Sequence, residues 1–589
     1  MFGNNYRIHF LFVLAWLLFP PITAGWILLR ISAPSGLAGS TLFKCFFFSS
    51  VCVTYWVAKV QYGQRKKALK AKRLGVALPP EPQGRWIGNI DLIIDNIKNY
   101  NEEPTMDYVE AFFEKFNTDT FNLRILWTDL YWTKNHHAMQ SILAKNFENY
   151  IKGPENKVVL DGVFGDGIFA VDGPAWRAHR AVMKPFFSRE RVRDFQLLDK
   201  YTDRILLILR SKDTSNESLD MQDLFSRFTL DAAGEFLLGT DRLNSLGLPL
   251  PMPGRAKIGS KGTELEGAYG SFVNAFDKIQ NIISLRYERN WFWPLLEFWR
   301  DETKEHKKVI NDFIAPLIRE AILAKRDREG NLLDTADCCF LEHLVDSTED
   351  EKLIQDQLLN TLVAARDTTT ALLTFLTYLL AIHPRVLRTV RDEVVSIAGD
   401  QPPSYELIRS MKYLRACLNE TLRLFPPVPI NGRASLRPAI LPSSTPNGPS
   451  YYVPGGLANV FFIPLLMQRR KDLWGEDAED FLPERWIEPN RIKELTDDPF
   501  KFLPFNAGPR LCLGQNFAYN EASFVIVRLL QNFDTFELRQ EEDAPQGSCP
   551  LPHWKEGRGR KRVERVWPRE GVTLYSKGGL WIRLSSKKH

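Results

Sequence analysis

Acidic residues are missing from the first 80 positions of this 589-residue chain. Ten of the 76 Lys and Arg residues lie there, and none of the 71 Asp and Glu residues, so the remaining chain carries a net charge of −5. The overall charge of +5 therefore comes from one terminal segment. A nucleic-acid-binding domain carries its excess positive charge over a binding face. The distribution argues against a nucleic-acid partner.

Cysteine is also scarce, and internal repeats are absent. Seven cysteines in 589 residues exclude a disulfide scaffold, and their odd number leaves at least one thiol unpaired within the chain. No period of 20–50 residues indicates a solenoid. The apolar content of 44% and the charged content of 25% are ordinary for a globular protein and exclude a disordered chain.

Two hydrophobic stretches occupy the N-terminus. The first, residues 8–29, is interrupted by Pro20 and Pro21, and the second covers residues 41–60. Because a helix needs ~20 apolar residues to span a bilayer, the second is the better span. The first either spans with a kink or is a cleaved signal peptide. Basic residues beside a span favour the cytoplasmic side, so the stretch RKKALKAKR at 65–73 predicts a cytosolic body.

The chain is thus predicted to have three parts. Residues 1–64 form a membrane anchor of one or two hydrophobic segments, and residues 65–89 form a basic stretch and a proline-rich hinge, stiffened by the sequence LPPEP at 78–82. From residue 90 to 589, stretches with helical periodicity predominate and strand-like pieces are short. We predict one large, mainly α domain with small β-sheets.

The most informative segment is FNAGPRLCLG at residues 505–514, a loop followed by a predicted helix from Gln515. A cysteine at a helix N-terminus has a lowered pKa, and a thiolate is a soft ligand for iron. Gly508 and Gly514 allow the backbone to approach a flat cofactor, and Arg510 pairs with an acidic group on it. The alternative interpretation of Cys512 is a buried structural cysteine.

This segment matches the F-x-x-G-x-R-x-C-x-G haem-binding signature of the cytochrome P450 family at every fixed position, and the chain resembles that family. The resemblance implies the cytochrome P450 fold and haem b as cofactor, with Cys512 as the metal ligand. It implies further haem-binding residues in the cysteine loop, in the sequence WRAHR at 176–180 and in NGR at 431–433. These are Phe505, Gly508, Arg510, Gly514, Trp176, Arg180 and Arg433.

A pair of charges in ETLR, residues 420–423, has i, i+3 spacing on a predicted helix. Alone, such a pair is a common surface feature. Together with PERW at 483–486, it resembles a family pattern that implies a buried structural ion network of Glu420, Arg423 and Arg485.

The sequence AARDTT at residues 364–369 lies in the long apolar helix predicted over 353–381. One interpretation is a polar patch on an amphipathic helix. The other is the family's oxygen-activating motif, which has Gly where this chain has Ala365. By resemblance, Thr368 hydrogen-bonds the bound oxygen and Asp367 helps to route protons, and both are candidate catalytic residues.

Finer details, including GIF at 167–169 and RRKDLWG at 469–475, are similar to fungal microsomal alkane and fatty-acid hydroxylases, although Gln468 replaces a usual His. The resemblance implies a membrane-anchored monooxygenase that hydroxylates a small lipophilic substrate, with alkane or fatty acid favoured. It implies O2, electrons from a separate NADPH-cytochrome P450 reductase, and a place at the endoplasmic reticulum membrane with the catalytic domain cytosolic.

Alternatives to this function remain at this point. The first is a haem-thiolate isomerase or peroxygenase, which needs no external electrons. The second is a monooxygenase acting on terpenoids or polycyclic aromatics. The third is a non-catalytic haem-binding protein.

Overall fold

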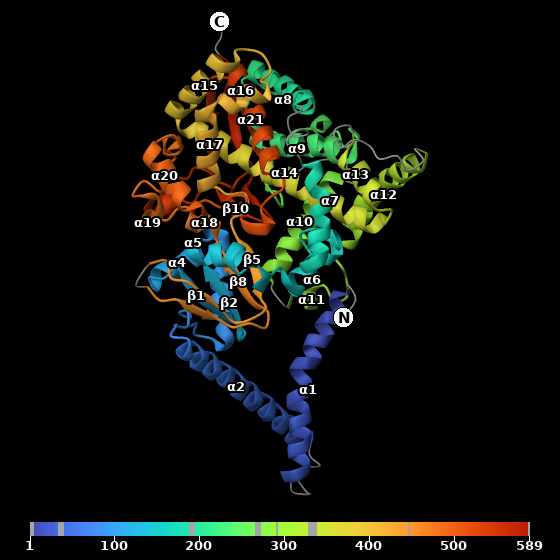
Figure 1. Cartoon of the computed structure of the whole chain (residues 1–589), viewed down its shortest axis with the longest axis vertical. Helices are drawn as coiled ribbons and strands as arrows, with labels where there is room; N and C mark the ends of the chain where they lie inside the picture. Colours follow the sequence, from blue (N-terminus) through green and yellow to red (C-terminus); the bar gives the residue numbers. More distant parts are fainter. Residues whose placement is uncertain are drawn as a thin grey trace.

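The computed structural model describes residues 5–32, 41–187, 195–264, 272–289, 292–327, 338–445 and 448–586. The body is mainly α with small sheets, as predicted, and a pair of long helices projects from one end of it (Figure 1). The first residues of the helices predicted over 188–211 and 269–285 lie outside the described residues.

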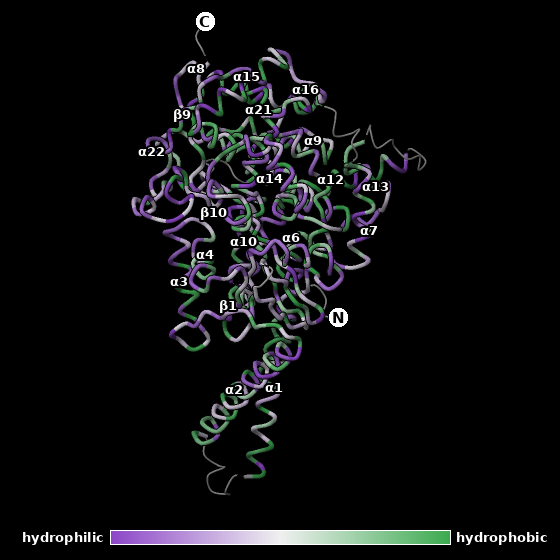
Figure 2. Tube along the Cα trace, turned by 60° about the vertical axis from the view of Figure 1, so that its left-hand side comes forward, coloured by the Kyte–Doolittle hydropathy of each residue, from purple (hydrophilic) through white to green (hydrophobic). Residues whose placement is uncertain are grey.

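The two N-terminal hydrophobic stretches form a helical hairpin. Helix α1 (Tyr6–Ser32) continues through both prolines, and helix α2 (Thr41–Arg73) returns beside it (Figure 1). Both are long and apolar enough to cross a membrane, judged by length and composition. Hydrophobic colour predominates on the part of the hairpin far from the body (Figure 2). The basic stretch after residue 64 is the last part of α2, because Lys and Arg are good helix formers.

Each end of the hairpin contacts the body. At the start of α1, the Tyr6 hydroxyl donates to the Glu297 carbonyl oxygen over 2.8 Å and Arg7 Nε donates to the Phe298 carbonyl oxygen over 2.7 Å. Near the end of α2, Lys67 forms an ion pair with Asp129. The beginning of α1 and the end of α2 therefore lie on the same side of the hairpin.

The proline-rich segment predicted as a hinge is held against the body. The Asn122 N–H donates to the Pro80 carbonyl oxygen over 2.9 Å, and Ala77 pairs with Tyr451 in a short β-bridge. Proline lacks an N–H but keeps its carbonyl as an acceptor, and the neighbouring strand uses this carbonyl. The segment therefore runs along a sheet.

The largest sheet has the strand order β1-β2-β8-β5-β3. Strands β2 and β8 run parallel, and the other neighbours run antiparallel. The strands of this sheet are β1 (Thr120–Ile125), β2 (Thr128–Thr133), β3 (Tyr150–Ile151), β5 (Asn431–Ser435) and β8 (Ala458–Phe462). The smaller sheets contain β4 (Leu219–Asp220), β6 (Ala439–Leu441), β7 (Tyr451–Val453), β9 (Thr535–Leu538), β10 (Pro568–Glu570), β11 (Leu574–Ser576) and β12 (Trp581–Ser585).

Helices make up most of the body and enclose its core. The longer ones are α3 (Ile90–Glu102), α6 (Gly153–Phe164), α7 (Gly173–Phe186), α8 (Gln196–Ser215), α9 (Met221–Leu238), α10 (Phe272–Glu288), α12 (Lys304–Asp327), α14 (Glu351–Ile382), α15 (Pro384–Ala398), α17 (Lys412–Leu424) and α21 (Gln515–Asn532). The shorter ones are α4 (Asp107–Lys115), α5 (His136–Gln140), α11 (Trp293–Leu296), α13 (Phe340–Ser347), α16 (Tyr405–Ser410), α18 (Pro464–Met467), α19 (Lys471–Trp474), α20 (Pro489–Asp497) and α22 (Gln540–Asp543). Three further turns matter below: η3 (Ser141–Lys145), η9 (Pro499–Lys501) and η10 (Gly508–Arg510).

Helix α14 runs through the centre of the body (Figure 1). It begins at the N-cap Asp350, whose side chain accepts from the Leu353 N–H. Its apolar residues from 354 to 363 pack in one hydrophobic cluster with α6, α7, α10 and α12, and those from 371 to 380 pack in another with α8, α15, α17 and α21. The polar stretch 364–370 therefore falls between two apolar clusters.

Candidate functional site

Cys512 follows the turn η10 and precedes α21, as the sequence predicted for a loop ahead of a helix. Its N–H donates to the Phe505 carbonyl oxygen over 3.1 Å. Burial raises the pKa of the Cys512 thiol, and the Gly514 N–H and the Arg180 charge lower it by less. The expected net lowering by the helix N-terminus is therefore wrong for the metal-free thiol, because burial outweighs it. A bound metal ion would deprotonate the thiol outright.

The side chain of Cys512 is accessible although the residue lies deep in the body. The residue lies deep enough for burial to raise its pKa, yet its side chain keeps a large accessible surface. Gly514 lies beside the sulfur, since a Cβ there would stand 4.0 Å from Sγ. An accessible cysteine at this position fits the role of ligand to the expected cofactor.

Gly508 has a different neighbour from the one expected. Its φ is +66°, and a Cβ would stand 1.9 Å from the Leu143 carbonyl oxygen on η3. A side chain at this position would clash with backbone, which cannot move aside cheaply. Gly508 therefore sets the close packing of the cysteine loop against η3.

A cluster of buried cations surrounds Asp172. The Asp172 carboxylate accepts from Arg510 Nη2 over 2.7 Å and from the N–H groups of Lys152 and Gly153 over 2.8 and 2.9 Å. Lys152 Nζ and Arg433 Nη1 both donate to Asn431 Oδ1 over 2.9 Å. Three positive side chains thus lie near one carboxylate, and only Arg510 forms an ion pair with it.

These cations are incompletely bonded. Arg433 Nε and Nη2 and Arg510 Nε are buried without a hydrogen-bond partner among the described residues. Burial and the nearby Arg510 charge lower the pKa of Arg433 to about 9, and burial, Arg433 and Arg510 lower that of Lys152 well below its ordinary value. Uncompensated buried charges are costly. The free donors fit the two carboxylates of a haem.

Trp176 and Arg180 lie one turn apart on α7, beside the cysteine loop. The buried Trp176 ring lies 4.5 Å from the Arg510 guanidinium, which gives a cation–π contact. Arg180 Nη2 donates to the Leu511 carbonyl oxygen over 2.8 Å. The structure therefore brings Trp176, Arg180, Arg433 and Arg510 to one region next to Cys512.

Thr368 and Asp367 lie in the polar stretch of α14. Thr368 Oγ1 donates to the Ala364 carbonyl oxygen over 2.6 Å, a local bond of the kind that distorts helices. The buried Asp367 forms an ion pair with Lys261, with 3.0 Å between Oδ2 and Nζ. Its neighbour Arg366 pairs with Asp277 on α10.

A cavity of about 530 Å³ reaches Asp367 from the side of α9, α10 and the loop 257–264. Its lining mixes acidic and basic side chains, among them Asp223, Asp277, Lys257 and Lys261. A charged cavity suits water and protons better than a lipophilic molecule.

The structure brings Glu420, Arg423 and Arg485 together in a fully buried network. The Glu420 carboxylate accepts from Arg423 over 2.7 and 2.8 Å and from Arg485 Nε over 3.4 Å. Burial raises the pKa of Glu420, but the two guanidinium groups and the Trp486 N–H lower it further, so it lies below its ordinary value. The network joins α17 to the 478–486 segment through Arg423 and the carbonyl oxygens of Ala478 and Asp480.

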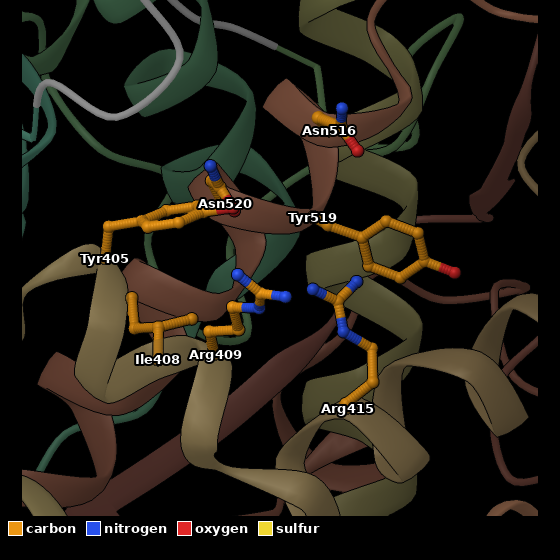
Figure 3. A pocket seen from close by; sticks show the side chains of 7 residues that line it. All are labelled: Tyr405, Ile408, Arg409, Arg415, Asn516, Tyr519 and Asn520. Atoms are coloured by element: carbon orange, nitrogen blue, oxygen red, sulfur yellow. The ribbon is translucent and has the colours of Figure 1, made fainter. Parts of the chain in front are cut away.

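A small hollow lies on the same side of the molecule as the start of α21. Figure 3 shows the Arg409 and Arg415 guanidinium groups facing one another in it, with Tyr519 beside Arg415. Arg415 lies 3.9 Å from the centre of the Tyr519 ring. Neither arginine has a carboxylate within ion-pair distance in the described part of the chain. Two unpaired guanidinium groups favour an anionic partner.

Three residues of the site were missed by sequence reasoning. Asp172, Lys152 and Lys261 lie in loops or at helix starts, where their side chains meet partners hundreds of positions away. A cluster of like charges cannot be seen in sequence when its members come from separate elements. The sequence DGPAW at 172–176, which begins with Asp172 and ends with Trp176, was the one pattern that could have pointed to Asp172.

Comparisons with known proteins agree with these observations. The model of the family "Cytochrome P450" matches residues 79–551, beginning inside the segment predicted as a hinge. Cytochrome P450 monooxygenase alt2 of Alternaria solani is 34% identical over 490 residues, covering 80% of this chain and 87% of that protein. Cytochrome P450 52A3-A of Candida maltosa is 35% identical over 480 residues (78% and 86%), and Cytochrome P450 52A13 of Debaryomyces hansenii is 30% identical over 511 residues (84% and 92%).

Proposed function

Because the chain belongs to the cytochrome P450 family, it is a haem-thiolate monooxygenase with a lipophilic substrate, and we propose how its own residues serve that activity. When bound, the haem supplies the iron at which O2 is activated for insertion of one oxygen atom into a C–H bond. The observation that carries the assignment is the accessible Cys512 beside buried, incompletely bonded cations.

Cys512 is the proposed iron ligand, and Arg433, Arg510 and Arg180 are the proposed partners of the haem propionates. Arginine is suited to this task because its planar fork donates two parallel hydrogen bonds to one carboxylate. Trp176 fixes the Arg510 guanidinium through its ring face. The Phe505 carbonyl oxygen accepts a hydrogen bond from the Cys512 N–H and so orients the loop.

The first experiment replaces the sulfur of Cys512 with oxygen. Cys512→Ser is expected to abolish the thiolate-type Soret band of the ferrous–carbon monoxide complex, because an alcohol is a poor ligand for iron. The spectrum is recorded on the purified full-length protein. Cys549→Ser is the matched control, as Cys549 is half-buried and far along the chain. A thiolate-type band that persists in Cys512→Ser would refute the ligand assignment.

Thr368 and Asp367 are the proposed residues for oxygen handling. Thr368 holds its hydroxyl on the helix through the Ala364 carbonyl oxygen, and can turn to donate to a group on the open side. Asp367 lines the charged cavity and directly precedes Thr368 in the chain, so we propose that its carboxylate passes protons inward from water. This arrangement favours a monooxygenase over an isomerase, which needs no such proton path.

The second experiment measures how efficiently reducing equivalents reach product. With NADPH and reductase, Thr368→Ala is expected to keep haem and substrate but to divert electrons to hydrogen peroxide, with product per NADPH falling about a hundredfold, the low end of a general acid's contribution. Thr361→Ala is the control, because Thr361 makes the same local bond two turns earlier on α14. An unchanged yield would contradict the role of Thr368. Full turnover with hydroperoxide alone would support the peroxygenase alternative.

An alkane or a fatty acid is the proposed substrate class. It is supported by the resemblance of residues 167–169 and 469–475 to fungal alkane and fatty-acid hydroxylases. At the departing position, Gln468 donates to the carbonyl oxygens of Leu422 and Arg423 and accepts from the Leu503 N–H, so it serves the core and does not alter a substrate wall. Binding spectra with alkanes, fatty acids, terpenoids and polycyclic aromatics would decide the class.

NADPH-cytochrome P450 reductase is the proposed electron donor. The hollow with Arg409 and Arg415 lies four to eight residues along α21 from Cys512, through Asn516 and Asn520 (Figure 3). Its unpaired guanidinium groups suit acidic side chains on a partner. Dependence of turnover on added reductase tests this partner.

The proposed location is the endoplasmic reticulum membrane, with a catalytic domain of residues 90–589 in the cytosol and residues 1–64 as the anchor. The two helices of the hairpin are long enough to cross, and both outer ends of the hairpin meet the body. Six basic residues between 65 and 73 stand at the body side, and Arg30 and Lys44 flank the far end. This asymmetry favours a cytosolic body.

A further inference from the structure

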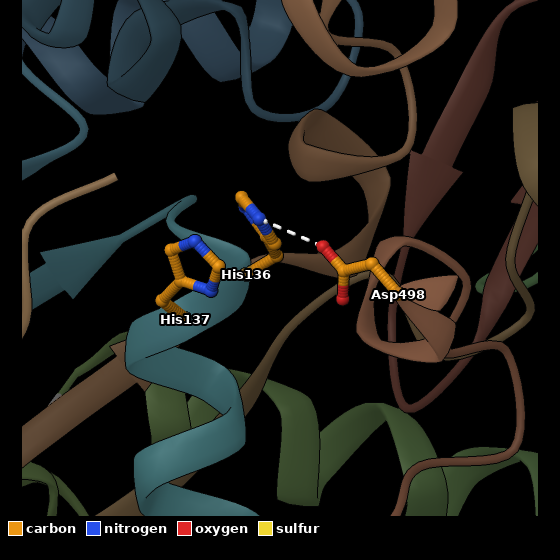
Figure 4. A group of neighbouring side chains, drawn as sticks. All are labelled: His136, His137 and Asp498. Carbon is orange, nitrogen blue, oxygen red and sulfur yellow. Dashed lines mark ion pairs between the residues drawn. The ribbon is translucent and has the colours of Figure 1, made fainter. Parts of the chain in front are cut away.

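Two adjacent histidines and an aspartate meet at the edge of the body, away from the residues described above. His136 and His137 begin α5, and Asp498 directly precedes η9 (Figure 4). One ligand atom from each of the three residues lies within 4.8 Å of the other two. His136 Nε2 is 3.0 Å from Asp498 Oδ2.

This group differs from an ordinary His–carboxylate pair in two respects. His136 is 4% exposed, and its Nδ1 is buried without a hydrogen-bond partner among the residues that the structure describes. The second imidazole, of His137, lies beside the first, with ring centroids 3.9 Å apart. The pair with Asp498 therefore leaves the hydrogen-bonding capacity of the buried ring incomplete and places another nitrogen donor next to it.

We propose that His136, His137 and Asp498 bind one Zn²⁺ ion. Two imidazoles and a carboxylate form a donor set that zinc uses, with a water molecule in the fourth position. In a tetrahedral site with bonds of about 2.0–2.1 Å, ligand atoms stand roughly 3.3 Å apart. His136 and Asp498 are already close to that spacing, and the exposed His137 can reach it by side-chain rotation.

Access and charge around the site define which ion fits. The Asp498 side chain is 24% exposed, so solvent reaches the carboxylate. Arg470 is nearby but already paired with Asp119 and Asp472, over 2.9 and 2.6 Å, and Lys501 adds a further positive charge. These cations disfavour hard ions held by charge alone. Imidazole nitrogen favours zinc over magnesium or calcium.

The ion would connect two elements that frame the cysteine loop. Helix α5 continues into η3, whose Leu143 carbonyl oxygen lies against Gly508. Asp498 and η9 lead along the chain into Phe505 and Cys512. Zinc binding would therefore restrain the loop and slow the loss of haem, a consequence that rests on the proposed function.

The test titrates Zn²⁺ into the full-length, haem-containing protein, purified through a histidine-free tag and stripped with a chelator. Calorimetry and metal analysis after dialysis should give one zinc per chain. The variant His137→Asn removes an exposed ligand and should weaken binding about tenfold or more. His553→Asn is the matched control, because His553 is an exposed histidine paired with Glu103 over 2.9 Å, and its affinity should be unchanged.

Equal zinc affinity in the wild-type protein and His137→Asn would overturn the site, as would an absence of binding or equal binding of Mg²⁺. Asp498→Asn provides a second variant that leaves the buried His136 in place, and it too should weaken zinc binding.

The rate of haem transfer to apomyoglobin is measured with and without Zn²⁺. If zinc binds but this rate is unchanged, the link to the cysteine loop is refuted and the metal site stands. A failure of the Cys512 ligand test would leave the zinc stoichiometry untouched.

Discussion

Arg433 carries a buried positive charge with two nitrogen atoms that no described residue accepts from. Burial and the charge of Arg510 lower its pKa to about 9, which shows how unfavourable the charged form is in the haem-free protein. Removing one partner from a buried ionic group is strongly destabilising. At the residue scale, the buried positive charges of the site are therefore unfavourable in the haem-free protein, and a dianionic ligand would neutralise them.

Arg433→Met tests whether this buried positive charge destabilises the haem-free protein. The haem-free variant should unfold at a higher temperature than the haem-free wild type, because the buried repulsion among Arg433, Arg510 and Lys152 is relieved. Haem should leave the loaded variant about tenfold faster, since a hydrogen bond to a charged group contributes ~1.5–3 kcal/mol.

Differential scanning calorimetry of the haem-free protein and haem transfer to apomyoglobin check the two effects. Arg437→Met, on an exposed residue just beyond the same strand, is the control. Unchanged haem loss in Arg433→Met would contradict the propionate assignment.

The sequence predicted those site residues that lie in contiguous motifs, and it missed those that reach the site from elsewhere. Cys512, Arg510 and Thr368 stand in short patterns whose spacing carries the signal. Asp172 and Lys261 enter through loops, and their partners Arg510 and Asp367 are distant in the chain. Net effects on pKa escape sequence reasoning for the same reason, as Cys512 shows: burial is a property of the fold.

At the element scale, α14 and α17 follow their sequence patterns closely and α9 does not. The long helix predicted over 353–381 appears as Glu351–Ile382, and the helix predicted around ETLR at 420–423 appears as Lys412–Leu424. Helix α9 is buried almost all round, so it lacks the polar face that produces helical periodicity. The predicted hinge at 78–82 likewise became part of a sheet edge through contacts that composition does not encode.

Glu521 on α21 yields a prediction of pH dependence. Burial raises its pKa from 4.5 to about 8, although a hydrogen bond with Thr369 on α14 opposes the shift. The folded protein therefore keeps a proton that the unfolded chain releases above pH 4.5. Stability from this group is fully present below pH 4.5 and is lost as pH rises toward 8, by about 1.4 kcal/mol per pH unit within that window.

Glu521→Gln removes this titration while keeping a neutral side chain of the same shape. The variant should match the wild type in free energy of unfolding near pH 5 and exceed it at pH 8, in urea denaturation at both values. Glu537→Gln, on the partly exposed strand β9, is the control, with no corresponding gain at pH 8. A constant difference between Glu521→Gln and the wild type across this range would refute the assigned titration.

At the scale of the whole molecule, the net charge of +5 separates into +10 over residues 1–80, −13 over residues 81–552 and +8 over residues 553–589. The anchor charge is concentrated at the body end of α2. The structure adds what the sequence left open: α1 is as long as a span, and its first turn is bonded to the 297–298 segment.

The hairpin predicts a topology in which the beginning of α1 and the body share the cytosolic side. An epitope placed before Tyr6 should be digested by protease added to intact microsomes, and a glycosylation acceptor inserted between α1 and α2 should be modified. An acceptor placed after Arg73 should remain unmodified as the control. Protection of the epitope before Tyr6 would show that α1 does not return to the cytosolic side.

The attachment of both hairpin ends has a mechanical consequence. A body joined to its membrane anchor by a single flexible linker can rotate relative to that anchor and present any face to its surroundings. Here the body is bonded to the hairpin at two points, through Tyr6 and Arg7 at one end and Lys67 at the other. These two attachments restrict rotation of the body relative to the hairpin. If the proposed electron donor lies in the same membrane, it would meet the proposed docking hollow beside α21 at a nearly constant height and tilt. The donor then has to find the correct lateral position in the membrane more than the correct orientation of its partner.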